Sequence, residues 1–213
     1  MSDTSLPPQR VKIYLDGFNL YFGMKDRGWQ RYYWLNVYKL AQEIMPKGAE
    51  LVGVSYFTSH VTGSPGKQKR QNDYLEALQT TPTQIIYGKY ISEPYYCYSC
   101  ANEAFTFKEK MTDVNIAVEM MEDAFVDRFD KALLISGDSD LTPPIAKIRK
   151  LFPEKEINVW FPPERKSSEL KKAASNTFDI NRTLLRDSQF PEEVTKADGY
   201  VLRRPEKWEK WAK

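Results

Sequence analysis

Short apolar runs alternate with longer helical stretches along most of this chain, and that alternation constrains the fold more than any other feature. The runs are rich in β-branched or aromatic residues and are bounded by turn or polar residues, which predicts strands. Five runs have this character: 11–15, 51–57, 84–90, 131–136 and 157–161. Helical spacing of apolar residues predicts the helices between them: 35–45, 66–79, 113–126, 143–151 and a short one near 167–174. The pattern predicts an α/β fold with a mostly parallel sheet and helices on both faces.

The chain is long enough for one main domain. With 213 residues, 41% of them hydrophobic, it can bury a sizeable core. We place this domain at 11–180, after an N-terminal tail, 1–10, and before a polar C-terminal extension, 181–213, that the pattern leaves unassigned. The stretch SEPYYCYSCANEAFTF, at 92–107, fits neither the helical nor the strand period, and we expect an inserted small hairpin there.

Composition also bears on location and partners. No apolar run approaches the roughly 20 residues of a membrane span, and the N-terminus has no secretory signal pattern. Only two cysteines are present, which fits a reducing compartment, so we expect a cytoplasmic protein without membrane contact. The formal net charge is only +2, so any contact with nucleic acid must depend on where the basic residues cluster.

Aspartates follow two of the predicted strands directly. The first strand ends in Asp16, and the fourth runs into GDSD, which holds Asp138 and Asp140. Asp113 begins a helix that should run antiparallel to that fourth strand, which places it at the same edge of the sheet. Ligands of open parallel sheets bind beyond the carboxyl ends of the strands, so we expect these four aspartates to converge on one crevice.

Each aspartate also has an ordinary structural explanation. Asp16 and Gly17 can form a simple turn, Asp113 can complement a helix dipole, and GDSD can bond its own backbone amides. Four carboxylates in one crevice, however, would repel one another unless a cation neutralised them. Oxygen ligands without histidine or thiolate favour Mg²⁺ or Mn²⁺, so we expect one of these ions as the cofactor.

Three motifs, in this order, resemble the NYN domain, specifically its LabA-like (DUF88) branch within the PIN-like nuclease superfamily. They are YLDGFNLY, KEKMTDVNIAVEMMEDAF and LLISGDSDLTPPIAKIRK, and the resemblance covers 11 to about 180. It implies a PIN-like three-layer α/β/α fold and a presumed ribonuclease. It also implies that an acidic metal site is formed by Asp16, Asp113, Asp138 and Asp140, with Asn19 as a polar partner. The chain differs from the family at Met111 and Thr112, where relatives tend to have glycine and an apolar residue.

The predicted chemistry is metal-assisted hydrolysis of RNA. One or two Mg²⁺ ions can make water nucleophilic near neutral pH and neutralise charge on the phosphate oxygens. We expect Asp16 and Asp138 to be the most direct ligands, with Asp113 and Asp140 acting through water or at a second metal. Asn19 would orient Asp16 or the scissile phosphate.

Substrate contacts are expected at the same edge of the sheet. Phosphate contacts by basic residues supply most of the sequence-independent affinity for nucleic acid, although charge runs are often only solvated surface. The candidate residues for substrate binding are Lys67, Lys69, Arg70, Arg165, Lys166, Ser136 and Ser139. The two serines can equally be ordinary strand-end and turn residues. Phe18, Tyr21 and Trp160 are candidates for stacking on bases, although most aromatic residues should be core.

Three functional classes are candidates for this chain. The first is a metal-dependent endoribonuclease acting on single-stranded or structured RNA. The second is a catalytically silent RNA-binding or regulatory NYN module, which the intact acids disfavour. The third is a haloacid dehalogenase-type phosphatase, which needs a second aspartate two positions after its nucleophile, where this chain has Phe18.

Cys97 and Cys100 form a C-x-x-C pair, which is half of a structural zinc site. We favour free thiols. Zinc shared across a homodimer, or completed by His60, the chain's single histidine, remains an alternative. A thioredoxin-like redox pair is less favoured, because no clear strand-to-helix turn surrounds the motif.

Overall fold

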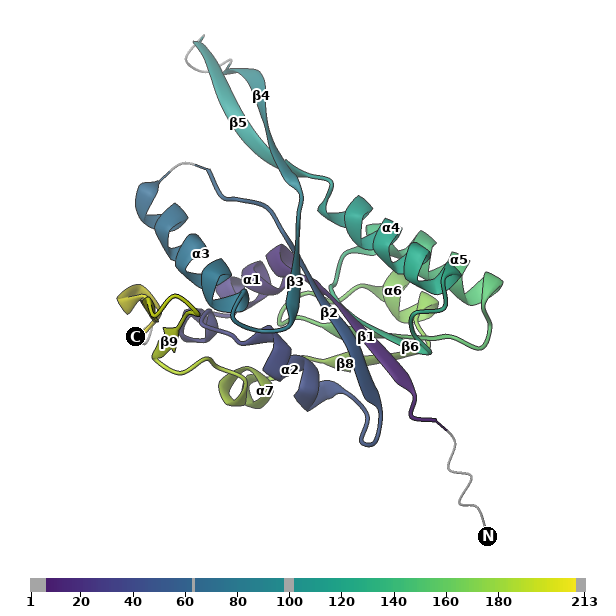
Figure 1. Ribbon diagram of the computed structural model, residues 1–213. Helices are drawn as coiled ribbons and strands as arrows, with labels where there is room; N and C mark the ends of the chain where they lie inside the picture. The colour runs from purple at the N-terminus through teal and green to yellow at the C-terminus, as the bar shows by residue number, and fades with distance from the viewer. Residues whose placement is uncertain (1–6, 63, 98–101, 210–213) are drawn as a thin grey trace.

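A six-stranded sheet forms the centre of the computed structural model, which describes residues 7–62, 64–97 and 102–209 (Figure 1). The strand order is β3-β2-β1-β6-β7-β8, and every neighbouring pair is parallel. The strands are β1 (Arg10–Asp16), β2 (Glu50–Thr58), β3 (Thr83–Tyr87), β6 (Lys131–Ile135), β7 (Glu156–Phe161) and β8 (Asn176–Asp179). The prediction of a mostly parallel sheet is confirmed.

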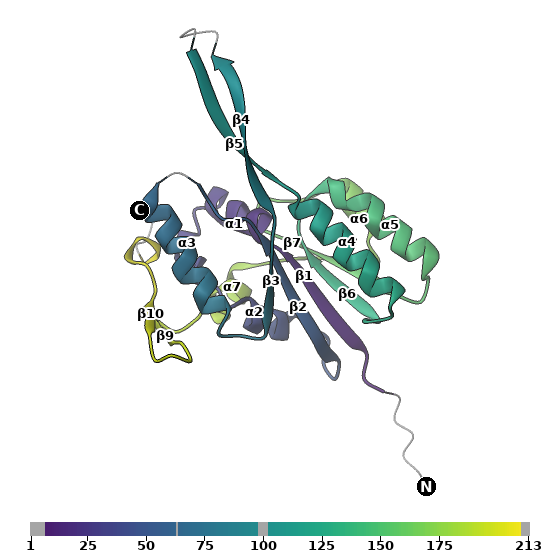
Figure 2. The same ribbon diagram turned by 45° about the horizontal axis from the view of Figure 1, so that its top comes forward.

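Helices cover both faces of this sheet. The α-helices of the described residues are α1 (Gly17–Asp26), α2 (Val37–Ile44), α3 (Pro65–Leu78), α4 (Thr112–Phe125), α5 (Thr142–Leu151), α6 (Ser168–Ala173) and α7 (Arg182–Asp187). Helices α4, α5 and α6 lie on one side of the sheet and α1, α2, α3 and α7 on the other, as Figures 1 and 2 show. This is the three-layer α/β/α arrangement that the resemblance implied.

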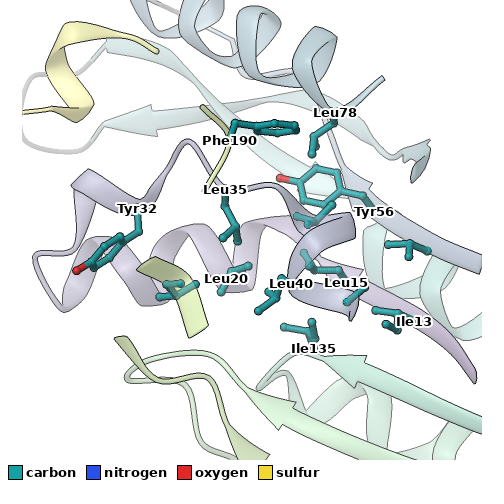
Figure 3. Packing of buried hydrophobic residues seen from close by; sticks show 14 of the residues in the cluster. Ile13, Leu15, Leu20, Tyr32, Leu35, Leu40, Tyr56, Leu78, Ile135 and Phe190 are labelled. Carbon is teal, nitrogen blue, oxygen red and sulfur yellow. The ribbon is translucent and has the colours of Figure 1, made fainter. Parts of the chain in front are cut away.

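The side chains of β1 point alternately into two hydrophobic cores, one on each face of the sheet. Ile13 and Leu15 are fully buried and pack toward α1, α2 and α3, whereas Tyr14 between them packs toward α4 and α5. Figure 3 shows the first of these clusters, where Leu20 of α1 and Leu40 of α2 meet the sheet residues. Successive side chains of a strand point to opposite faces, so a central strand buried on both faces reads as a continuous apolar run.

The C-terminal segment folds back onto the face that carries α1, α2 and α3. It contains α7, the short antiparallel strands β9 (Glu193–Thr195) and β10 (Val201–Arg203), and the 3-10 helix η3 (Glu206–Trp208). Phe190 is buried in the first core, and the indole Nε1 of Trp34 donates a hydrogen bond to the carbonyl of Pro191 at 2.7 Å. This segment therefore completes that core.

The strand predicted over 84–90 is wrong in its second half. Strand β3 ends at Tyr87, and after Gly88 the chain enters β4 (Lys89–Cys97), which pairs antiparallel with β5 (Asn102–Lys110). This hairpin projects beyond the sheet in both views (Figures 1 and 2). The error arose because β-branched and aromatic residues continue on both sides of Gly88, which hides the change of direction.

Two further observations concern the expectations about cysteine and membranes. Cys100 and the side chain of Cys97 lie outside the described residues, so the alternatives for the C-x-x-C pair stay predictions. Within the described part of the chain, no helix has both the length and the apolar character needed to cross a membrane.

Candidate active site

Asp16 stands where β1 ends and α1 begins. Leu15 and Ile135 are partners in the register of β1 and β6. Asp16, the last residue of β1, and Ser136, the residue after β6, therefore lie at the same edge of the sheet. The Asp16 carboxylate caps α1, because its Oδ1 accepts a hydrogen bond from the Asn19 amide at 2.9 Å. A core strand thus ends on a carboxylate that also starts a helix.

A hydrogen-bond network joins the two motifs that follow β1 and β6. The hydroxyl of Ser136 donates to Oδ2 of Asp16 at 2.9 Å, and the amide of Asp138 donates to that hydroxyl at 3.1 Å. The amide of Gly137 donates to Oδ1 of Asn19 at 2.9 Å. Ser136 and Asn19 therefore fix the position of the Asp16 carboxylate relative to the loop that carries Asp138.

Both glycines of these motifs permit close approach of the backbone. A Cβ atom on Gly17 would lie 2.6 Å from the hydroxyl oxygen of Tyr56 and 2.7 Å from the carbonyl oxygen of Phe57. A Cβ atom on Gly137 would overlap the carbonyl group of Arg165. Neither site has room for a side chain, so the glycines allow the strand ends and the neighbouring loops to pack together.

Three of the four predicted acids line one small cavity. Asp16, Asp113 and Asp138 form its acidic part, and Arg165 is the basic residue in its wall. The cavity has a volume of about 170 Å³, and its remaining lining residues are Phe18, Asn19, Phe22 and Thr112. Asp113 lies in the first turn of α4, so the antiparallel course of that helix brings it to this edge, as the sequence predicted.

Electrostatics at this cavity disfavour the charged form of Asp16. The side chain is buried, with only 3% of the residue exposed. Burial raises the pKa of Asp16 to about 7; the charges of Asp113 and Asp138 add to the increase, and the hydrogen bonds from Asn19 and Ser136 oppose it. A bound cation would favour the ionised carboxylate.

The donor atoms at the cavity are suited to a hard cation. They are carboxylate, hydroxyl and amide oxygens of Asp, Thr and Asn side chains, which Mg²⁺ and Mn²⁺ prefer over softer ligands. Among the described residues, no group of three or more His, Cys, Asp or Glu side chains is arranged to hold a metal ion. Mg²⁺ is usually held by one or two carboxylates together with water molecules, so the residues present fit such an ion.

The other predicted site residues of GDSD lie at the edge of the cavity or beyond it. Ser139 and Asp140 are exposed and begin the 3-10 helix η2 (Ser139–Leu141), and neither lines the cavity. The amide of Asp140 donates to Oδ1 of Asp138 at 3.0 Å. The backbone of Asp140 therefore orients Asp138, while its own carboxylate stands outside.

The basic residues after β7 have different positions. Arg165 lines the acidic cavity and forms an ion pair with Asp26 of α1. Lys166 is exposed and pairs with Asp179 at 2.8 Å, outside the cavity lining. Of these two residues, only Arg165 lies in the wall of the acidic cavity.

The basic residues of α3 also lie at different cavities. Lys67 and Arg70 line a second cavity of about 530 Å³, which shares Phe18 and Phe22 with the acidic one. Lys69 instead forms an ion pair with Asp73 at 2.9 Å and lines a different hollow beside β10. Helical phase explains the difference, because successive residues of a helix point about 100° apart.

The second cavity contains residues that the sequence reasoning missed. Phe22, Lys25 and Trp208 line it, together with the predicted stacking residues Phe18 and Tyr21. The spacing of Phe18, Phe22 and Lys25 at i, i+4 and i+7 is a helical signal that would have placed them on one face. The third predicted stacking residue, Trp160, is not part of this cavity; it stacks on Phe178 of β8, with ring centroids 4.7 Å apart.

Comparisons with known proteins agree with the fold and the motifs. The chain is 27% identical over 177 residues to 6-hydroxy-3-succinoylpyridine 3-monooxygenase HspA of Pseudomonas putida, a match covering 67% of this chain and 56% of that protein. It is 25% identical over 196 residues to low amplitude and bright protein LabA of Synechococcus elongatus, covering 89% of this chain and 95% of LabA. The chain therefore spans little more than half the length of the first relative and nearly all of the second.

A solved structure shares the fold. A protein of unknown function from Vibrio parahaemolyticus superposes with a TM-score of 0.59 at 18% identity, over 84% of this chain and 97% of that one. The family model described as the NYN domain matches residues 10–181. Since this match takes in most of the chain and LabA is similar over nearly its whole length, the chain belongs to the NYN domain family, on its LabA-like branch.

Proposed function

We propose that this chain is a metal-dependent endoribonuclease that hydrolyses RNA phosphodiester bonds at the cavity lined by Asp16, Asp113 and Asp138. One observation carries the proposal: a carboxylate that is 3% exposed, with its pKa raised to about 7, shares a cavity with two further acids. Perturbed acids in a cavity are typical of functional sites. Membership in the NYN family supports the choice of RNA as substrate.

The residues of this chain would have different roles at the proposed site. Mg²⁺ or Mn²⁺ bound there would supply charge neutralisation at the phosphate and an activated water. Asp16 and Asp138 would be the direct ligands, and Asp113 would bind through water or at a second metal. Ser136 and Asn19 hold the Asp16 carboxylate beside the loop that carries Asp138. Arg165, which lines the cavity, would contact a phosphate oxygen. Asp140, outside the cavity, would contribute through water.

The relatives do not decide the reaction. One is named as a monooxygenase and the other is named without an activity, so function has to be argued from the site. The alternative is a catalytically silent RNA-binding or regulatory module that retains the same fold. Such a module would bind RNA at the same edge of the sheet without hydrolysing it.

The proposal is tested by incubating the purified protein with single-stranded and structured RNAs in Mg²⁺, Mn²⁺ or EDTA. We expect cleavage with either ion and none in EDTA. Asp113→Asn should lower the cleavage rate by more than about 100-fold, beyond what the loss of an outer hydrogen bond costs at a metal site. Asp140→Asn is the matched variant and should cost less, because Asp140 is exposed and does not line the cavity.

Two results would count against this function. Cleavage that persists unchanged in EDTA would remove the metal from the mechanism. Binding of RNA without cleavage under either ion would favour the silent module instead.

A further inference from the structure

We infer that the larger, aromatic cavity beside the acidic one binds an unpaired base of the RNA substrate, an inference that rests on the proposed ribonuclease function. The two cavities are adjacent, because Phe18 and Phe22 of α1 line both. These rings lie 6.2 Å apart, centroid to centroid, in a nearly parallel arrangement. A nucleotide whose phosphate lies at the acids can therefore place its base in the neighbouring cavity.

The size and walls of this base cavity suit a nucleobase. Its volume of about 530 Å³ falls in the range of small-molecule sites, roughly 300–1,000 Å³. Five further aromatic side chains line it: Tyr21, Tyr33, Tyr56, Tyr74 and Trp208. Aromatic side chains bind single-stranded nucleic acid by stacking, which tolerates any sequence because every base has a flat π-face.

Charge around the base cavity favours an anionic ligand. Lys25, Lys67 and Arg70 all contribute to its lining, and the first two are exposed. The ammonium of Lys25 lies 5.6 Å from the ring centre of Phe22, next to the shared wall. Basic residues at this place can neutralise the phosphates that flank a base held between the rings. A neutral ring compound would lack this charge neutralisation.

The C-terminal segment completes the wall of the base cavity. Trp208 lies beyond residue 181, where the family match ends. Its ring packs edge-on against Tyr33, with centroids 5.7 Å apart, and lies near Trp34 at 6.2 Å and Tyr74 at 6.1 Å. Trp208 is only partly buried by these contacts and also faces the cavity. The extension thus adds a stacking surface to the nuclease domain.

Such a cavity distinguishes single-stranded from double-stranded RNA. Bases inside a duplex are stacked and paired, so a base must be unpaired before it can enter a side cavity between aromatic rings. We therefore expect single-stranded RNA to bind more tightly than a duplex of the same sequence.

The experiment measures binding in EDTA, where cleavage cannot interfere, by fluorescence anisotropy of a labelled single-stranded RNA and of its duplex. Trp208→Ala and Thr62→Trp are the test variants, and Trp160→Phe is the control, because Trp160 lies outside the base cavity. Thr62 is exposed at the cavity wall, so a tryptophan there blocks the cavity without disturbing the core. This second variant keeps the test decisive if Trp208→Ala fails to fold.

We expect both test variants to lose at least about tenfold in affinity for the single strand, the lower end of what stacking of a base on an aromatic side chain supplies. The control should bind as the wild type does, and the duplex should bind weakly to all four proteins. Unchanged affinity in Thr62→Trp, or equal affinity of the wild type for duplex and single strand, would overturn the inference.

Failure of the proposed nuclease function would give results that differ from failure of the base-cavity inference. If the wild type binds single strands through Trp208 but never cleaves them, the inference about the base cavity holds and the proposed nuclease function is wrong. Conversely, if Trp208→Ala and Thr62→Trp cleave single strands with an unchanged KM, the inference about the base cavity is wrong and the proposed nuclease function holds.

Discussion

Asp16 and Asp123 are two deeply buried aspartates with opposite surroundings. Asp123 is fully buried and forms ion pairs with Lys12 and with Arg128, the latter at 2.8 Å. Asp16, by contrast, accepts its two hydrogen bonds from neutral groups, the Asn19 amide and the Ser136 hydroxyl. A buried charge is tolerated when it is paired or coordinates a metal. The fold therefore neutralises Asp123 with its own basic side chains, whereas the printed hydrogen bonds of Asp16 come from neutral groups and leave its charge uncompensated.

The raised pKa of Asp16 makes a prediction about stability and pH in EDTA. Its pKa is about 7 in the folded protein against 3.8 for an ordinary aspartate side chain, so the folded state binds more protons between these values. The free energy of unfolding should therefore fall as pH rises from 4 to 7. Each unit of pKa shift is worth about 1.4 kcal/mol, which bounds the effect at about 4 kcal/mol.

The check is urea unfolding of the wild type and Asp16→Asn across this pH range. Asparagine does not titrate, so the variant should gain stability over the wild type progressively toward pH 8, by more than about 1 kcal/mol. Curves that stay parallel from pH 4 to pH 8 would show that burial does not perturb Asp16.

At the scale of elements, helix α4 begins with backbone strain. Met111 precedes it with φ of 81° and ψ of −12°, in the left-handed region that glycine adopts without penalty. The resemblance to the family implied glycine at this position, and the left-handed conformation gives a physical reason for that preference. The strain lies directly next to Thr112 and Asp113, which line the acidic cavity.

Met111→Gly should therefore stabilise the protein by about 0.5–1 kcal/mol, because relief of the left-handed strain exceeds the entropy that glycine gains in the unfolded chain. Met111 is 45% exposed, so little packing is lost. Val118→Gly in the middle of the same helix, also exposed, is the control and should destabilise it. Thermal unfolding of the three proteins decides; a lower Tm for Met111→Gly would contradict this interpretation.

Helix α3 provides a matched pair of basic residues. Arg70 lines the base cavity, whereas Lys69 is paired with Asp73 on another side of the helix. We predict that Arg70→Ala weakens binding of all RNA sequences alike and flattens the salt dependence, by about 0.7 units of log-log slope for one lost phosphate contact on a single strand. Lys69→Ala should change neither. Equal losses in both variants would place the RNA path elsewhere on α3.

Periodicity predicted the longer elements and failed where packing overrides local preference. The predicted helices agree with α2 to α6 to within two residues at each end. Helix α1 was missed because Gly17 and Gly23 weaken a helical pattern, although each glycine is needed where the helix touches Tyr56 or Pro163. The short strand β8 and the C-terminal strands carry too few residues to show a period.

On the scale of the whole molecule, topology explains how much of the site was predictable. The rule that ligands bind at the carboxyl edge of a parallel sheet predicted that four aspartates lie together. Asp16, Asp113 and Asp138 line one cavity, whereas Asp140 does not. The base cavity could not be predicted in the same way. It is built from α1, α3 and Trp208, segments whose proximity depends on how the C-terminal segment folds back.

Metal binding should stabilise the folded molecule as a whole. A ligand that binds only the folded state raises stability with its concentration, by about 2.7 kcal/mol at 100 times its Kd. We predict that Mg²⁺ or Mn²⁺ raises the Tm of the wild type and that Asp138→Asn diminishes this shift. Asp73→Asn, away from the acidic cavity, is the control. Isothermal titration calorimetry that detects neither ion at millimolar concentration, with or without RNA, would remove the basis for the metal site.

The most direct test of the central claim compares cleavage with binding in Asp16→Asn. If Asp16 serves the chemical step while basic residues hold the RNA backbone, the variant should lose cleavage in Mg²⁺ or Mn²⁺ and still bind RNA. Binding should even tighten slightly, because a negative charge near phosphates is removed. A wild type that cleaves RNA beside an inactive, fully binding variant is the result we predict. Cleavage by Asp16→Asn at the wild-type rate would contradict the account.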